Sequence, residues 1–448
     1  MDNRAYQISE SFLETLYERL TGSTEAIVPD DNLSDVFLRG NTPSREHLAE
    51  MINVAHWASY TTEEGHPVIV SLIYRELPRT NDAFHFDIPL DFCDKTLGKL
   101  GPALTSPHAD IAVWPDGSGQ LKIWGFTSIP DETTIKSDLW VQILGPGRIL
   151  IMYSGRAVAA LSANQAVFID PRSFLHSIMP KIVAQAQATD ITLTNLFRYN
   201  AILKIAQQMR LHGRGGTVLI VPAGKSWEKS IATPVKYTGG TDFLDAEAMV
   251  PTPSRTELAN AENLIRIVSE MNLTLKRDWL HNWQQVQRQC SRIARLTAVD
   301  GALVMTFDRY VHCFGAKIKA LDPRSAAGEL SVIEPFENRP VTKKSFSDLS
   351  GTRHLSAAQF AFDQPEALVV VASQDGNVTF FTKTSDGKGI LTVQQAEMAL
   401  LHEGLGSLAW NLSFFSEMGW LDKGIGKNEK GYLAGVLTWM RNAFRKDG

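Results

Sequence analysis

The chain has 448 residues, of which 44% are hydrophobic and 21% charged, enough to bury the cores of two or three domains of about 150 residues each. Its 44 basic and 49 acidic residues give a formal net charge of −5, which argues against a general nucleic-acid-binding protein. Three widely separated cysteines exclude a disulfide framework, and the absence of a long uncharged apolar run argues against a membrane span. We therefore expect a cytoplasmic protein without a signal peptide.

The first 190 residues are predicted to form an α+β domain. Apolar residues such as Phe12 and Leu16 recur at helical spacing up to about residue 60. From 66 to 170 the pattern changes to β-rich runs, and PDGSG (115–119) and GPG (145–147) each join two runs as hairpin turns. No acid–base or metal cluster is expected in this domain.

Residues 191–402 are predicted to form an α/β domain, a mixed sheet flanked by helices, because strands and helices alternate along the sequence. A helix over 191–216 precedes a short apolar strand at 217–224, and residues 250–297 form an apparent helical insertion. The remaining predicted elements are strands at 300–318, 366–376 and 377–383, a helix at 350–362, and a helical tail over 403–448.

Two motifs of this domain place carboxylates at strand ends. Asp300-Gly301-Ala302 begins a strand, where an exposed carboxylate can bind a metal ion and a small neighbour admits a nucleotide; a simple turn is the alternative. Ser373 and Asp375 close the apolar strand 366–372, where α/β sheets often bind ligands, although a plain β-turn has the same composition.

A third motif, Gly351-Thr352-Arg353-His354, combines a hydroxyl, a guanidinium and an imidazole at the start of a predicted helix. Backbone N–H groups, the helix dipole and an arginine together suit an oxyanion such as phosphate. The alternative is a Thr that caps the helix beside solvated neighbours.

The order of these motifs resembles the diadenylate cyclase (DAC) domain family over residues 195–400. A DGA strand start is followed after about 50 residues by GTRH, and after about 20 more by a Ser-x-acid turn. The N-terminal domain resembles the sensor domains that are fused to some bacterial DAC domains. The resemblance implies an enzyme that condenses two ATP molecules into cyclic di-AMP and two pyrophosphates across a face-to-face homodimer or a higher homo-oligomer.

The resemblance also assigns roles to single residues. Asp300, Arg353 and His354 would be catalytic, with Asp300 and Asp375 holding Mg²⁺ or Mn²⁺. The nucleotide would be bound by Gly301, Ala302, Gly351, Thr352 and Ser373.

The chain departs from the family pattern at Leu355, where a second arginine is usual, and at Gln374, where a carboxylate is common. A lost charge-assisted contact costs about 1.5–3 kcal/mol, so Lys225, Arg309 or Lys343 would have to compensate for Leu355. Two alternatives to an enzyme stay open. One is a DAC-fold protein that binds ATP or cyclic di-AMP as a signal, and the other is an α/β scaffold or partner-binding module with an accidental motif match.

Overall fold

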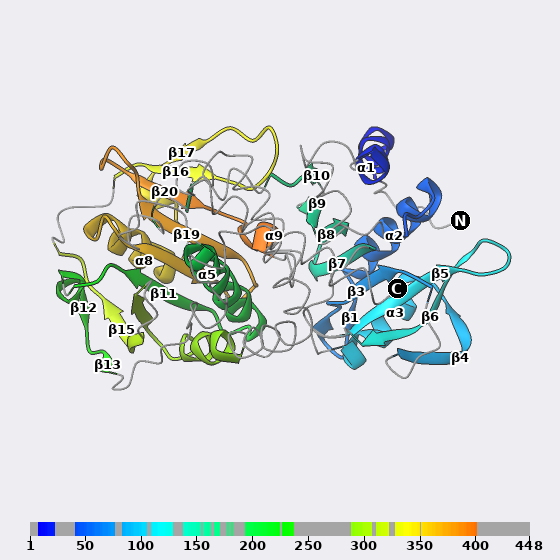
Figure 1. Ribbon diagram of the computed structural model, residues 1–448, viewed down its shortest axis with the longest axis horizontal. Helices are drawn as coiled ribbons and strands as arrows, with labels where there is room; N and C mark the ends of the chain where they lie inside the picture. The colour runs from blue at the N-terminus through cyan, green and yellow to red at the C-terminus, as the bar shows by residue number, and fades with distance from the viewer. Residues whose placement is uncertain are drawn as a thin grey trace, which may run out of the picture. The chain divides into compact units, whose positions relative to one another are not determined.

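The computed structural model divides the chain into two compact units, and within the described residues the first ends at Ile169 and the second begins at Asp170 (Figure 1). The structure describes residues 8–22, 41–76, 83–104, 109–128, 138–153, 156–162, 165–170, 177–178, 181, 193–224, 226–236, 288–306, 311–321, 328–349 and 351–400. Within these residues no helix combines the length and the apolar character needed to cross a bilayer.

The first unit is built on an eight-stranded sheet with helices packed against it. In spatial order the strands are β10 (Gln165–Phe168), β9 (Arg156–Ser162), β8 (Arg148–Tyr153), β7 (Leu139–Gly145), β3 (Ser71–Tyr74), β5 (Ala109–Pro115), β6 (Leu121–Ser128) and β4 (Ala83–Asp91). Neighbouring strands are antiparallel except for β3 and β5, which are parallel. The strands β1 (Thr62–Glu63) and β2 (His66–Pro67) form a separate small ribbon.

Helices α1 (Glu10–Gly22), α2 (Arg45–Ala58) and α3 (Asp94–Leu100), with the short 3-10 helix η2 (Gly101–Leu104), complete this unit. The apolar residues that recur at helical spacing are buried in one cluster with strand residues of the sheet. This cluster includes Phe12, Leu16, Leu20, Leu48, Met51, Ile52, Ile111, Val113, Val141 and Ile151. The predicted α+β class and both predicted hairpins, β5–β6 and β7–β8, are confirmed.

The second unit contains a ten-stranded mixed sheet. Its strands run in the order β12 (Ile231–Ala232), β15 (Val311–Ile318), β14 (Ala302–Thr306), β11 (Gly216–Val221), β18 (Leu368–Ala372), β19 (Val378–Lys383), β20 (Ile390–Val393), β16 (Leu330–Ile333) and β17 (Thr342–Lys344), with β13 (Val235–Lys236) also paired to β15. Helices α5 (Leu193–Leu211), α8 (Thr352–Asp363) and α9 (Glu397–Leu400), a helix over 288–296 and the 3-10 helices η3 (Ser226–Ser230) and η4 (Phe346–Asp348) accompany it.

Helix α8 packs on one face of this sheet, and α5 contacts β18 from the other face (Figure 1). The side of α8 that faces the sheet buries small and aromatic residues, and complete burial of Phe360 alone contributes about 1.5–3 kcal/mol. The residues shared between α8 and the sheet are Leu219, Val304, Ala357, Ala358, Phe360, Ala361, Val369 and Phe381. The predicted α/β fold class is therefore confirmed.

Strand register brings the motif-bearing turns to one end of the sheet. Strands β11 and β14 are parallel, with Thr217 opposite Ala302, whereas β18 runs antiparallel to β11, with Ala372 opposite Gly216. The segments before β11 and β14 and the turn after β18 therefore leave the sheet at the same end, which we call the site end. The predicted tail over 403–448 and most of the predicted insertion at 250–297 lie outside the described residues.

Candidate functional site

Asp300 lies at the site end, immediately before β14, and its carboxylate is 87% exposed. Gly301 has φ +116°, and a Cβ placed there would lie 2.5 Å from the carbonyl carbon of Gly315 in β15. Gly301 is thus required by the close approach of two backbones, which is a structural reason for the motif beside the predicted nucleotide contact. Ala302 is buried as the first residue of β14.

The carboxylate of Asp300 forms an ion pair with the Nζ of Lys317, from β15. This hydrogen bond lowers the pKa of Asp300, and the charges of Lys317 and Arg353 lower the pKa further. Asp300 is consequently ionised at neutral pH and carries the charge that a divalent cation requires.

Arg353 lies in the first turn of α8, which begins after Gly351 at the site end. Its guanidinium approaches the backbone before β11 so closely that a Cβ at Gly215 would lie 2.6 Å from Arg353 Nη1. A side chain at position 215 would therefore require the guanidinium of Arg353 to shift. Thr352, the first residue of the helix, is exposed.

His354 follows Arg353 but points toward β19. Its Nε2 lies 3.4 Å from the hydroxyl of Thr379, and its ring meets that of Phe381 edge to face, with centroids 5.9 Å apart. The pKa of His354 is lowered, mainly because the ring is buried. The charge of Asp375 raises this pKa and the charge of Arg353 lowers it. The imidazole is therefore mainly neutral at pH 7 and can act as a hydrogen-bond donor.

The turn between β18 and β19 carries Ser373 and Asp375. The amide of Asn377 donates to the Ser373 hydroxyl at 3.1 Å, and the Asn377 side-chain amide donates to the Asp375 carboxylate at 3.2 Å. Ser373 thus has a structural role in the β-turn, which was one of the two interpretations of this motif. Asp375 is exposed and acts electrostatically on His354.

The structure brings all three motifs to one end of the sheet. Asp300 interacts with Arg353, and His354 interacts with both Arg353 and Asp375. Two carboxylates, a guanidinium and an imidazole therefore lie at the same end of the sheet, although about 75 residues of sequence separate the first from the last. Such a group can bind a phosphate chain and a divalent cation together.

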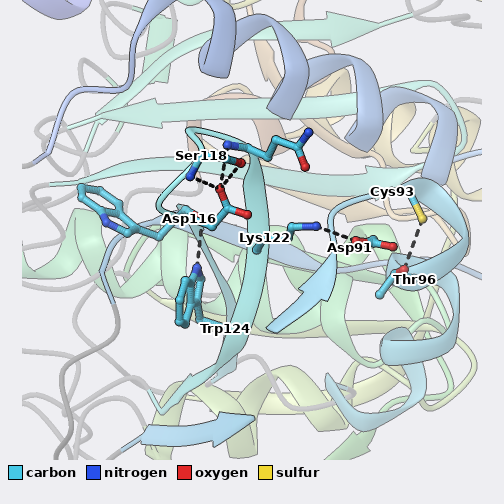
Figure 2. Close-up of polar contacts among 9 residues, drawn as sticks. Asp91, Cys93, Thr96, Asp116, Ser118, Lys122 and Trp124 are labelled. Carbon is cyan, nitrogen blue, oxygen red and sulfur yellow. Dashed lines mark hydrogen bonds and ion pairs between the residues drawn. The ribbon is translucent and has the colours of Figure 1, made fainter. Parts of the chain in front are cut away.

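The first unit has polar contacts of a different kind. Figure 2 shows the β5–β6 hairpin, where the Asp116 carboxylate accepts hydrogen bonds from the amide and hydroxyl of Ser118. In the same view Lys122 binds Asp91, and the Trp124 indole donates to the backbone carbonyl of Trp114. These contacts fix a turn and join adjacent strands, so they explain the hairpin without implying a catalytic centre.

Residues 39–128 match the family described as probable sensor domain DACNV. The match runs from before α2 to the end of β6 and so includes the hairpin of Figure 2. It confirms the predicted resemblance of the N-terminal domain to a sensor domain. A search of curated proteins and a search of solved structures each found no match.

The residues at the site end fit a metal ion that arrives with a nucleotide. Among the described residues no three His, Cys, Asp or Glu side chains gather as they would around a resident ion. Mg²⁺ usually binds through one or two carboxylates and completes its shell with substrate phosphates and water. Asp300 offers one exposed carboxylate before β14, and Asp375 offers another in the turn after β18.

Sequence reasoning missed Lys317 and Gly215. The pairing of Ala302 with Ala316 across the β14–β15 hairpin places Lys317 beside Asp300, and the sequence carries no signal for this register. Leu355 packs against the core cluster under α8 instead of facing the site. Of the cations expected to compensate, Lys343 lies in the edge strand β17 and binds Glu329 and Ser331. Lys225 and Arg309 lie outside the described residues.

Proposed function

We propose that the second unit is a diadenylate cyclase domain, regulated by the sensor domain of the first unit. The observation that carries the proposal is that Asp300 and Arg353, from motifs about 50 residues apart, lie at the same end of the sheet, with the Arg353 guanidinium beside Gly215. The match of residues 39–128 to a sensor family supports it, because sensors of this family occur together with DAC domains.

In the proposed reaction each protomer of a face-to-face dimer holds one ATP. The 3′-oxygen of one nucleotide forms a bond to the α-phosphorus of the other, while the bond from that phosphorus to the bridging oxygen of the β-phosphate breaks. Pyrophosphate leaves with the bond electrons, and the 3′-hydroxyl proton is accepted at the Asp300 carboxylate. Two such steps give cyclic di-AMP and two pyrophosphates.

Each side chain at the site end would have its own role in this reaction. Arg353 would bind phosphate oxygens through its guanidinium, and His354 would donate a hydrogen bond to the same chain. Asp300 and Asp375 would hold Mg²⁺ or Mn²⁺, which when bound supplies positive charge to the phosphate oxygens. Gly351 and Thr352 would offer the first backbone N–H groups of α8 to the phosphates.

A second candidate function is a nucleotide-binding protein without turnover. The observation that favours it is the packing of Leu355 on the core, because α8 then contributes a single guanidinium where the family usually has two. Under this alternative the site would bind ATP or cyclic di-AMP and release it unchanged.

Incubation of the full chain with ATP and Mn²⁺, followed by mass spectrometry for cyclic di-AMP, distinguishes the two functions. We expect Asp300→Asn to lower product formation by roughly 100-fold or more, since it removes the proton acceptor and a metal ligand. Asp87→Asn, which removes an exposed carboxylate of β4 in the first unit, is the charge-matched control and should retain activity. Binding of ATP without product, by folded wild-type protein, would favour the second function.

A further inference from the structure

Lys317 forms an ion pair with Asp300. Strand register explains its position, because Ala316 lies opposite Ala302 in the β14–β15 hairpin and so brings residue 317 to the start of β14. The lysine is 52% exposed and the aspartate 87% exposed. Ion pairs so open to water contribute little to stability, so fold stability alone gives little reason for the pair.

The charges that act most strongly on Asp300 are positive. Asp300 forms an ion pair with Lys317, and the charges of Lys317 and Arg353 both lower the pKa of Asp300. These three side chains together carry one net positive charge at neutral pH, and the carboxylate of Asp375, at the same end of the sheet, balances it. His354, mainly neutral, adds a donor to the same region without adding charge.

Helix α8 contributes less positive charge to a bound phosphate chain than the resemblance to the DAC family implies. Leu355 packs against the core cluster that α8 shares with the sheet, so Arg353 is the guanidinium that the first turn of the helix contributes. A polyphosphate bound beside Arg353 would need a further cation from another element. Strand β15 supplies a lysine next to the same carboxylate.

We infer that Lys317 binds the phosphate chain of the nucleotide and supplies the second cation of the site from β15. This inference rests on the proposed nucleotide site but not on turnover. A lysine suits the task because its ammonium has three donors on a flexible stem, so it can contact the carboxylate and phosphate oxygens at once. Lys317 would also offset the repulsion between Asp300 and the phosphates before a metal ion binds.

Calorimetry with the α,β-methylene analogue of ATP tests the inference without requiring chemistry. We expect Lys317→Gln to weaken binding by roughly 10- to 100-fold, the range for a lost charge-assisted contact. The loss should be larger in EDTA than in Mg²⁺, because the metal ion offsets part of the missing charge. Lys317→Arg should bind within about threefold of wild type, since the cation is retained.

Lys319→Gln is the matched control. Lys319 is exposed two residues further along the chain and is not among the groups that shift the pKa of Asp300. Its replacement removes the same charge from the same region, so analogue binding should change by less than about twofold if local contact matters more than total charge.

Each outcome decides the inference. Unchanged binding by Lys317→Gln would overturn it and leave the proposed function standing, and tighter binding would overturn it by showing that Lys317 obstructs Asp300. Wild-type protein that binds the analogue but makes no cyclic di-AMP would overturn the cyclase proposal, while the variants still decide the role of Lys317. Wild-type protein that binds no analogue in either buffer would overturn both.

Discussion

At position 301 the backbone of β15 leaves no space for a side chain. A Cβ there would lie 2.5 to 2.8 Å from three backbone atoms of Gly315, and the φ of +116° adds strain for any other residue. We predict that Gly301→Ala destabilises the second unit by at least about 2 kcal/mol, from overpacking and backbone strain together, in urea unfolding followed by circular dichroism.

Gly213→Ala is the control for that measurement. Gly213 also has positive φ, +65°, but a Cβ there would meet no atom within 4 Å, so the substitution adds strain without a clash. We expect it to cost about 1 kcal/mol. Equal losses for the two variants would show that the approach of Gly315 does not constrain the motif.

Single residues also show how far the sequence can predict the site. Asp300 and Arg353 could be named from sequence because their motifs combine a turn glycine with functional side chains in a recognisable order. Lys317 could not, because its proximity to Asp300 depends on the register of a hairpin that contains two register shifts. The hydrogen bond that the Ser373 hydroxyl accepts likewise depends on the geometry of one turn. The roles assigned to these residues in binding and catalysis stay predictions.

Among the elements, the end of α5 and the residue that follows it connect the two loops that carry the carboxylates. The Arg210 Nε donates to the carbonyl of Gly376 at 3.1 Å, in the turn that holds Asp375. The His212 Nε2 lies 3.1 Å from the hydroxyl of Thr297, three residues before Asp300. Movement of this helix end would therefore displace both loops.

We predict that Arg210→Met loosens the 373–377 turn while leaving the rest of the sheet intact. Methionine keeps most of the aliphatic stem beside Gly376 but removes the donor, so the turn loses one charge-assisted hydrogen bond. Hydrogen exchange measured by mass spectrometry should be faster in peptides that cover this turn, and stability should fall by about 1 kcal/mol. Arg214→Met, at an exposed neighbouring position, should change neither quantity.

Elements were predicted more accurately than their boundaries. The β-rich pattern that begins at residue 66 predicts no boundary between β2 and β3, yet the two strands lie in different sheets, because β2 pairs with β1 while β3 joins the main sheet. By contrast, the helix expected at 350–362 is α8, whose small and aromatic residues recur on one face. Helical periodicity reports a single buried face, whereas strand partners are set by distant segments.

At the scale of the whole molecule, composition and patterning indicated two domains of different construction. The structure contains a helix-covered sheet, of which the part within residues 39–128 matches a probable sensor domain, and a second mixed sheet with helices on its faces. Pairing between distant strands, such as β11 with β18, could not be derived from local patterns, and it is this pairing that assembles the site end. Strand topology thus determines where the motifs lie in space, whereas the sequence alone indicates their chemistry.

The proposed reaction needs two chains, and this gives a prediction for the intact molecule. If each protomer contributes one nucleotide, activity per chain should fall on dilution below the dimer dissociation constant, because monomers hold half of a reaction centre. Initial rates of cyclic di-AMP formation, measured beside the molar mass from light scattering, should fall in parallel with the dimer fraction. A constant rate per chain in solutions proven to contain monomer would contradict the shared site.

Mixing wild-type protein with the Asp300→Asn variant provides an independent check, since about a tenfold excess of the variant places most wild-type chains in mixed dimers. Such dimers retain one intact carboxylate, so they can form one of the two phosphodiester bonds, and cyclic product should decline while a linear dinucleotide accumulates.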